Sequence, residues 1–310
     1  MGVLSGQAKV RLGTRSSPLA RWQAEWVAAR LTALGVQVEM IHITTQGDVT
    51  TGPLGQIGGQ GLFTKEIQRA LLDNRIDLAV HSLKDLPTDP VPGLKIAAVP
   101  LREATADVLV GRFTTLDDLP PGARIGTGSL RRRAQLLHQR PDLQLLEIRG
   151  NVDTRLRKLD AGDYDAIVLA QAGLSRLGLA ARIAYIIPPQ TMLPAVGQGA
   201  LGLETRADDA KTIELLQPLN DEATHSAIIA ERTLLNSLRA GCLAPVGAWA
   251  RVTDRGLLLQ ATVLHPDGTK KLAAEGLAPP LQAEGLGREV AQQLIDQGAT
   301  ELITAAHQAR

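Results

Sequence analysis

Residues 9–15 (KVRLGTR), 18–35 (PLARWQAEWVAARLTALG) and 38–45 (VEMIHITT) decide the fold class. The first and third stretches are short and rich in apolar residues, as strands are, whereas the middle stretch has the length and composition of a helix. The same alternation returns in residues 63–83. A chain that alternates strands with helices is typical of an α/β fold.

The alternation continues in residues 123–139, 143–159 and 165–178, each of which predicts a strand that leads into a helix. Residues 103–122 predict a crossing into a second α/β unit, and the glycine-rich residues 194–204 predict a crossing back.

The pattern changes after about residue 220. A predicted helix (222–238) is followed by a cysteine-containing loop, by strands with the turn sequences TDRG and HPDG between them, and by a helix at 283–297. We therefore predict an α/β protein of two α/β domains and a small C-terminal α+β domain. The predicted boundaries are 1–104 with 200–219 for domain 1, 105–199 for domain 2 and 220–310 for domain 3.

Composition limits the function classes. With 310 residues and 44% hydrophobic content, the chain can bury a sizeable core. Its net charge is +1 and only 2% of its residues are aromatic, which argues against a nucleic-acid surface. The single cysteine excludes an internal disulfide, and neither it nor the six histidines show metal-ligand spacing. We find no signal peptide and no apolar run of about 18 residues, so we expect a cytoplasmic protein without a membrane partner and without a metal.

Polar and charged residues follow the predicted strands. Because ligands of open α/β sheets bind beyond the carboxyl ends of the strands, these positions are candidate site residues. They are Arg15 and Ser17, then His81, Ser82, Lys84 and Asp85, then Thr127, Ser129, Arg131, Arg132 and Arg133, then Arg149, Asn151 and Arg155, and last Gln171 and Arg176.

Three consecutive arginines follow Ser129, which is a predicted N-cap. Cations in the first turn of a helix are unfavourable, by about 0.3–1 kcal/mol each, unless an anion is near. We favour anion binding by Arg131 and Arg132, whereas a solvated Arg133 is an equally good interpretation. Arginines at several strand ends indicate a ligand with several carboxylates or phosphates.

Lys84 and Asp85 follow a predicted buried strand. They could form an ordinary surface ion pair. In a cleft lined by arginines, the carboxylate of Asp85 could instead stabilise a cationic intermediate and accept hydrogen bonds from N–H groups.

Two motifs are misleading. Gly197, Gly199 and Gly202 match the dinucleotide pattern G-x-G-x-x-G, but neither the strand before it nor the helix after it is predicted. Residues 130–140 (LRRRAQLLHQR) resemble a DNA-reading helix, which makes a DNA-binding regulator a minor alternative that the charge balance does not support.

The chain closely resembles the porphobilinogen deaminases, also called hydroxymethylbilane synthases. The resemblance covers essentially the whole chain and rests on eight stretches in order: RLGTRSSPLARWQ, GGQGLFTKE, DLAVHSLKDLPT, GTGSLRRRAQL, IRGNVDTRL, LAQAGLSRLG, PAVGQGALGLE and RAGCLAPVG. It implies two domains like those of two-lobed (type II) periplasmic binding proteins, with a third domain that carries the cysteine.

The resemblance also implies an activity and a cofactor. Cys242 would be bonded through a thioether to a dipyrromethane cofactor, which serves as the primer. Four porphobilinogen molecules would be deaminated and added to the growing oligopyrrole chain, and hydrolysis would release hydroxymethylbilane. The enzyme would be a transferase of tetrapyrrole and heme biosynthesis, active as a monomer. A non-catalytic, two-lobed binding module for a small polyanion is the alternative, although such a module needs no covalent tether.

The resemblance implies a role for each matched residue. Asp85 would stabilise the positive charge that develops as ammonia departs. The cofactor would be held by Cys242, Lys84, Asp85, Ser129, Arg131, Arg132 and Arg155, and the substrate by Arg15, Ser17, Arg149, Arg155 and Arg176. Gln56 and Gln60 stand where relatives often have lysines, and Gly128 stands where a hydroxyl residue is common.

Overall fold

A computed structural model describes residues 8–45, 64–241 and 244–308. The chain divides into two compact units, Met1–Arg102 with Ala200–His225 and Glu103–Gly199 with Ser226–Arg310. The second unit contains both a five-stranded and a three-stranded sheet. A division of this unit into the predicted domains 2 and 3 stays a prediction.

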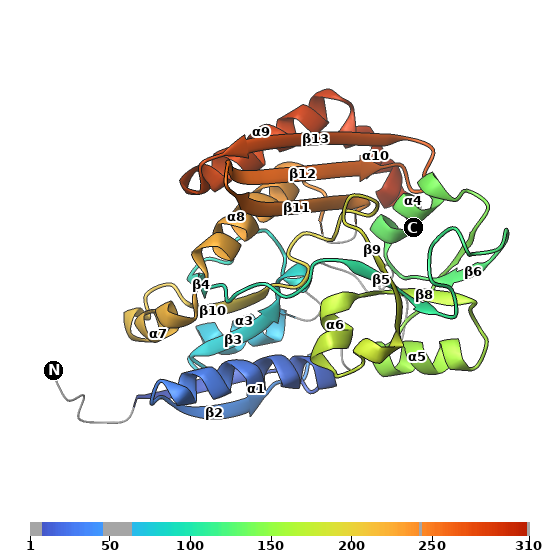
Figure 1. Ribbon diagram of the computed structural model, residues 1–310. Coiled ribbons are helices and arrows are strands. Elements are labelled where there is room, and N and C mark those ends of the chain that lie inside the picture. The colour runs from blue at the N-terminus through green and yellow to red at the C-terminus, as the bar shows by residue number, and fades with distance from the viewer. Residues whose placement is uncertain (1–7, 46–63, 242–243, 309–310) are drawn as a thin grey trace. The chain divides into compact units, whose positions relative to one another are not determined.

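The first unit contains a five-stranded sheet of order β2-β1-β3-β10-β4 (Figure 1). β1 is parallel to β2 and β3, whereas β10 is antiparallel to both of its neighbours, β3 and β4. The strands are β1 (Lys9–Thr14), β2 (Gln37–His42), β3 (Leu78–Ser82), β4 (Leu94–Ala98) and β10 (Leu201–Arg206).

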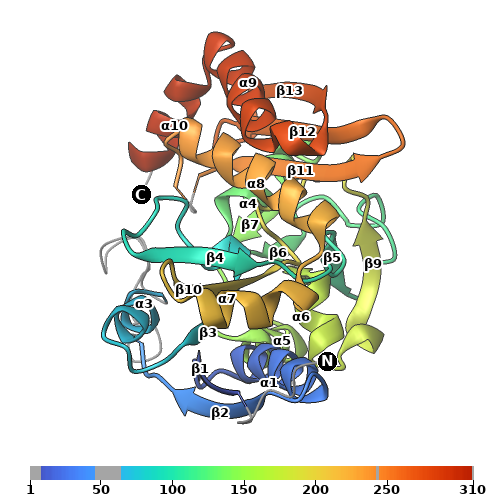
Figure 2. The ribbon, with the colours of Figure 1, turned by 90° about the vertical axis from the view of Figure 1, so that its left-hand side faces the viewer.

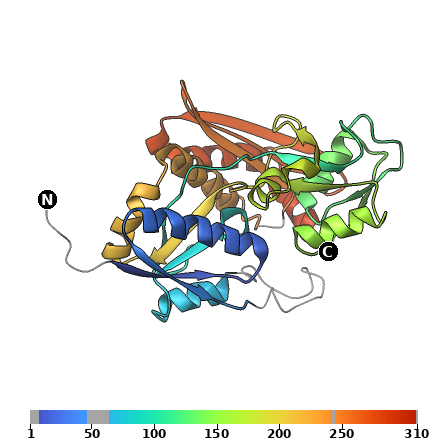
Figure 3. The same cartoon turned by 60° about the horizontal axis from the view of Figure 1, so that its bottom comes forward.

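Helices cover both faces of this sheet. α1 (Pro18–Ala33), which Figure 3 brings forward, and α7 (Ala210–Leu216) share one hydrophobic cluster with Leu78. α3 (Lys65–Leu72) packs on the other face, where Ala79 lies (Figure 2). Because neighbouring residues of β3 point to opposite faces and both faces are covered, the strand begins with three apolar residues, Leu78–Val80. Two 3-10 turns complete the unit, at Leu83–Asp85 and Gln217–Leu219.

The second unit repeats this pattern in a sheet of order β7-β6-β8-β5-β9. β6 is parallel to β7 and β8, whereas β5 is antiparallel to β8 and β9. The strands are β5 (Asp107–Gly111), β6 (Arg124–Gly126), β7 (Gln144–Leu146), β8 (Ala166–Ala170) and β9 (Ile183–Ile187).

The second sheet is also covered on both faces. Leu109 packs in a cluster with Leu136 of α4, whereas Val108 packs with Leu156 of α5 and Leu174 of α6. The helices are α4 (Leu130–Gln139), α5 (Val152–Asp160) and α6 (Gln171–Arg176), with a 3-10 turn at Ala180–Arg182.

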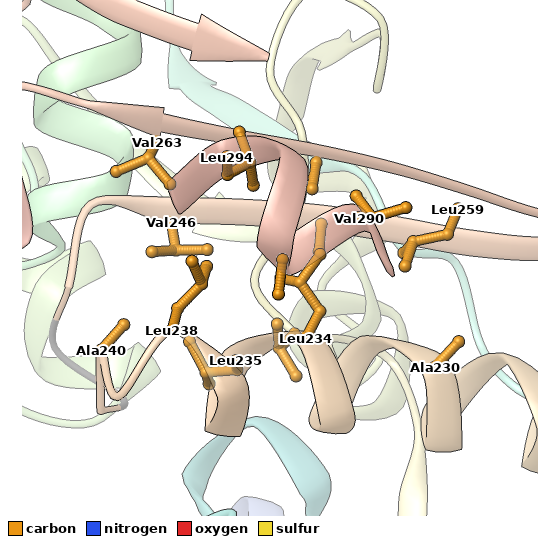
Figure 4. Close-up of a cluster of buried hydrophobic side chains, with 14 of the residues drawn as sticks. Ala230, Leu234, Leu235, Leu238, Ala240, Val246, Leu259, Val263, Val290 and Leu294 are labelled. Atoms are coloured by element: carbon orange, nitrogen blue, oxygen red, sulfur yellow. The ribbon is translucent and has the colours of Figure 1, made fainter. Parts of the chain in front are cut away.

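The C-terminal part of the second unit is a three-stranded antiparallel sheet of order β11-β12-β13. Its apolar face packs against helices, as Leu234, Val246, Val263 and Leu294 show in Figure 4. The strands are β11 (Val246–Thr253), β12 (Gly256–Leu264) and β13 (Lys271–Ala278). The helices are α8 (Glu222–Ser237), which begins within the first unit, α9 (Ala283–Asp296) and α10 (Ala299–Gln308), with a 3-10 turn at Pro280–Gln282.

The predicted fold class is confirmed, because two α/β sheets are followed by a small α+β portion. The predicted turns TDRG and HPDG also lie where expected, between β11 and β12 and between β12 and β13. Within the residues that the structure describes, none of the helices has the length and apolarity that crossing a membrane requires.

Candidate functional site

The loops after β1 and β3 bring four of the candidate residues to one edge of the first sheet. β1 and β3 are parallel, so their carboxyl ends lie at the same edge. The loop after β1 contains Arg15 and Ser17, and the turn after β3 contains Lys84 and Asp85. The side-chain oxygen of Ser17 accepts a hydrogen bond from the backbone N–H of Ala20 at 3.3 Å, which confirms the predicted N-cap.

The backbone of the Asp85 turn is held by buried residues on both sides. Leu83 and Leu86 are buried, and the Leu83 N–H donates to the Ala200 carbonyl at 3.1 Å. Lys84 is half-buried and Asp85 is exposed. Asp85 makes no hydrogen bond or ion pair with the described residues, so its carboxylate is accessible to a ligand while its backbone is fixed.

The second sheet gathers a larger set at its corresponding edge. β6, β7 and β8 are parallel, and the loops after them lead into α4, α5 and α6. Ser129 caps α4, where its oxygen accepts from the Arg132 N–H at 3.4 Å, and Asn151 caps α5 in the same way. Two helix N-termini, with their partial positive charge, thus lie at the edge that also carries the candidate arginines.

Arg131 and Arg132 are not solvated. Their exposed fractions are 3% and 6%, and both form ion pairs with Asp107, which is fully buried. Burial by itself raises the pKa of Asp107, but the charges of Arg131 and Arg132 outweigh it and hold this pKa well below its usual value. Arg133 is exposed and donates to the Leu145 carbonyl at 2.9 Å, which agrees with the solvated alternative.

Three further candidate arginines have partners within their own unit. Arg149 pairs with Glu147, and Arg155 donates through Nε to the Gly150 carbonyl at 2.8 Å. Arg176 is buried and donates through Nη2 to the Gly199 carbonyl at 2.6 Å. Burial lowers the pKa of Arg176. These contacts hold the guanidinium groups of Arg149, Arg155 and Arg176 near the strand ends.

Comparison with known proteins decides the family. The family model "Porphobilinogen deaminase, dipyromethane cofactor binding domain" matches residues 10–214, and the model of the C-terminal domain of porphobilinogen deaminase matches residues 225–296. The chain belongs to the porphobilinogen deaminase family. Porphobilinogen deaminase of Syntrophotalea carbinolica is 49% identical over 302 residues, which are 96% of this chain and 95% of that protein.

Two solved structures resemble this chain at low sequence identity. The methionine binding protein MetQ has a TM-score of 0.43 and 15% identity, and the similarity covers 68% of this chain and 89% of that chain. A periplasmic binding protein of Salmonella typhimurium has a TM-score of 0.39 and 13% identity, over 68% of this chain and 91% of that one.

Membership of the porphobilinogen deaminase family establishes the general activity. The chain is a transferase of tetrapyrrole biosynthesis, a hydroxymethylbilane synthase, with porphobilinogen as the substrate of its family. The match to the cofactor binding domain also assigns a dipyrromethane cofactor to it.

The charges around Asp107 fit a cofactor that carries carboxylates. Two guanidinium groups face one carboxylate, so the buried cluster keeps one positive charge in excess. In addition, the Nε of Arg131 is buried and has no hydrogen-bond acceptor within the described part of the chain. A buried cation and a buried N–H donor that lack a counterpart are both stabilised by a carboxylate.

The structure thus brings the predicted site residues into two groups, one in each unit. Arg15, Ser17, Lys84 and Asp85 lie at the edge of the first sheet, and the second group is Ser129, Arg131, Arg132, Arg149, Arg155 and Arg176. Cys242, Gln56 and Gln60 lie outside the described residues. At Gly128, a Cβ would lie 2.9 Å from the Ile148 carbonyl oxygen, so glycine suits this close approach.

Sequence analysis missed Asp107 and Gln198. Asp107 begins β5, and the Nε2 of Gln198 donates to its Oδ1 at 2.9 Å. The only local signal was an aspartate at the start of an otherwise apolar strand (DVLVG). A charged residue in such a strand needs a buried partner, but the sequence does not show which one.

Proposed function

We propose that the chain deaminates four porphobilinogen molecules, losing one ammonia with each, and joins them head-to-tail on a dipyrromethane primer. Hydrolysis of the bond to the primer then releases hydroxymethylbilane. The primer is bonded to Cys242 and, when bound, supplies the free pyrrole carbon to which the first substrate is joined. The observation that carries this proposal is the excess positive charge of Arg131 and Arg132 over Asp107 at the edge of the second sheet.

The arginines supply the binding of carboxylates in this proposal. Arg131, Arg132 and Arg155, with Ser129 and Lys84, hold the acetate and propionate groups of the cofactor. Arg15, Ser17, Arg149, Arg155 and Arg176 bind those of the substrate and the growing chain. A guanidinium binds a carboxylate through two parallel hydrogen bonds, which fixes the orientation of the ring as well as its position.

Asp85 supplies the electrostatics of the chemical step. Its carboxylate accepts hydrogen bonds from pyrrole N–H groups and stabilises the positive charge that develops on the substrate as ammonia leaves. The exposure of Asp85 and the buried Leu83 and Leu86 on either side support this role, because the charge is fixed in place yet accessible.

The test compares Asp85→Asn with Asp89→Asn, a neighbouring exposed aspartate. We expect turnover of porphobilinogen to fall by about 10² or more in Asp85→Asn, because its negative charge is removed while its shape is kept. Asp89→Asn should keep the parental rate. The intact mass of each protein is measured first, with Cys242→Ser as the reference that lacks the mass of two pyrrole units.

Two results would contradict the proposal. Parental turnover in Asp85→Asn with the cofactor mass present would show that the charge at this position is not needed. An active Cys242→Ser protein, or a parental protein without the added mass, would contradict the covalent primer.

A further inference from the structure

Asp107 lies at the edge of the second sheet that carries the candidate residues. It is the first residue of β5 and is paired with Ala170, the last residue of β8. Because β5 is antiparallel to β8, the beginning of β5 lies at the carboxyl end of β8. The side chain is nevertheless fully buried. An ionised carboxylate at such a place persists only if several partners compensate for its lost hydration.

The two oxygens of Asp107 hold two different arginines. Oδ1 accepts from the Nε of Arg132 at 3.0 Å and from its Nη2 at 2.8 Å. Oδ2 lies 2.7 Å from the Nη1 of Arg131. The two guanidinium groups therefore share one carboxylate, which sets their orientations relative to each other.

Backbone carbonyls complete the environment of these arginines. Arg132 donates through Nη1 to the Val168 carbonyl at 2.9 Å, and Arg131 donates through Nη1 to the Leu193 carbonyl at 2.6 Å. Neither carbonyl carries a full charge. Within the described residues, Asp107 is the one carboxylate that forms an ion pair with either arginine.

Gln198 holds the carboxylate of Asp107 in turn. Its Nε2 donates to Asp107 Oδ1 at 2.9 Å and to the Thr105 carbonyl at 2.8 Å. The residues on both sides of Gln198 are fixed. The Gly197 N–H donates to Glu231 Oε2 at 2.8 Å. Gly199 has a φ of +85° and packs against the Glu103 carbonyl, whose oxygen would lie 2.4 Å from a Cβ at this position.

We infer that Asp107, held by Gln198, is a positioning residue that orients Arg131 and Arg132 toward the carboxylates of the cofactor. This inference rests on the proposed function, in which these two arginines bind the cofactor. It differs from simple charge neutralisation, in which Asp107 only weakens the attraction of the arginines for an anion. If Asp107 only neutralised the arginines, removal of its negative charge would strengthen cofactor binding. If Asp107 positions the arginines, the same removal weakens cofactor binding.

The experiment measures the fraction of purified chain that carries the mass of two pyrrole units, in the parent and in variants expressed side by side. We expect the loaded fraction to fall at least tenfold in Asp107→Asn. The control is Asp142→Asn, which removes an aspartate that pairs with Arg140 just beyond the other end of α4. The control should be loaded as fully as the parent. Equal or higher loading in Asp107→Asn than in the parent would overturn the inference.

Asp107→Glu distinguishes a role of Asp107 that depends on its charge from one that depends on its size. Glutamate keeps the charge but is longer, so it disturbs the packing of a fully buried site more than asparagine does. We expect higher loading in Asp107→Glu than in Asp107→Asn. The reverse order would show that Asp107 acts through its size alone, and it would overturn the inference.

Folding is checked by circular dichroism. If Asp107→Asn does not fold, Gln198→Leu takes its place, since it removes the amide that holds Asp107 and leaves all charges in place. Reduced loading in a folded Gln198→Leu protein supports the inference, and parental loading overturns it.

Arg132→Leu is measured alongside. Parental loading in Arg132→Leu contradicts the proposed function itself, whereas reduced loading there together with parental loading in Asp107→Asn overturns only the inference.

Discussion

β5 and β10 occupy corresponding places in their sheets, yet their buried carboxylates have different surroundings. Each strand is the antiparallel one, between the third parallel strand and an edge strand, in the orders β8-β5-β9 and β3-β10-β4. β5 carries Asp107 and β10 carries Glu204, and both side chains are buried. Similar backbone arrangements therefore place one carboxylate inside each unit.

The partners of the two carboxylates differ in charge and position. Asp107 faces two arginines at the edge of its sheet, whereas Glu204 accepts from Gln68 Nε2 at 3.0 Å and lies 2.9 Å from His81 Nε2. Glu204 is paired with Ala79, the second residue of β3, so it lies within the sheet and away from its carboxyl edge. A carboxylate that contacts an amide and an imidazole inside a sheet stabilises the fold. A carboxylate that pairs with two arginines at the edge of a sheet can also help to bind a ligand.

The largest expected effect on stability belongs to Asp107→Asn. Removal of its charge leaves two buried guanidinium groups without a counter-ion, and breaking a buried pair in this way costs about 3–5 kcal/mol. We expect the free energy of unfolding in urea to fall by this amount. Asp142→Asn, in a partly exposed pair, should change it by less than about 1 kcal/mol. Equal losses in the two variants would show that the Asp107 cluster is no more tightly coupled than a surface pair.

The pH dependence of stability gives a smaller effect with a definite sign. The pKa of Asp107 in the folded protein lies below the ordinary value of 3.8, so its ionised form stabilises the fold fully above about pH 4. Below this pH the unfolded chain takes up the proton first, and the contribution decreases. The difference in the free energy of unfolding between the parent and Asp107→Asn should therefore shrink by up to about 1.4 kcal/mol per pH unit below pH 4.

Urea titrations from pH 6 to pH 3 measure this difference. All other acids are common to the two proteins, so the difference isolates Asp107. A difference that stays constant over this range, or grows as the pH falls, would contradict the ionised state of Asp107 in the folded protein.

Local patterns predicted the alternating strands and helices, and the caps at Ser17 and Ser129 are confirmed. They did not predict β5 and β10, both of which begin within segments interpreted as crossings. These strands pair with strands that the sequence does not place beside them, and Glu204 contacts His81 across 123 positions. Likewise, Gln198 lies 91 positions from Asp107. The spacing of apolar residues in a sequence shows which face of a helix or strand is buried, but it does not show which distant element covers that face.

The smallest effect expected from a change at either buried carboxylate belongs to Glu204→Gln. Glutamine has nearly the same shape and can still accept from Gln68 through its carbonyl oxygen. Its amide can donate to His81 when the Nε2 of that ring is the acceptor, so both hydrogen bonds can be kept. We therefore expect the free energy of unfolding in urea to fall by only about 0.5–1.5 kcal/mol, the net contribution of one hydrogen bond. The loaded fraction should equal that of the parent, because Glu204 contacts none of the candidate arginines within the described part of the chain. Glu204→Leu is the matched variant, since it removes both hydrogen bonds at a similar volume and leaves Gln68 and His81 unsatisfied, which should cost more than glutamine does. If Glu204→Gln were as destabilising as Asp107→Asn, the negative charge of Glu204 would matter as much as that of Asp107, and the two carboxylates would not differ in the way that their partners indicate.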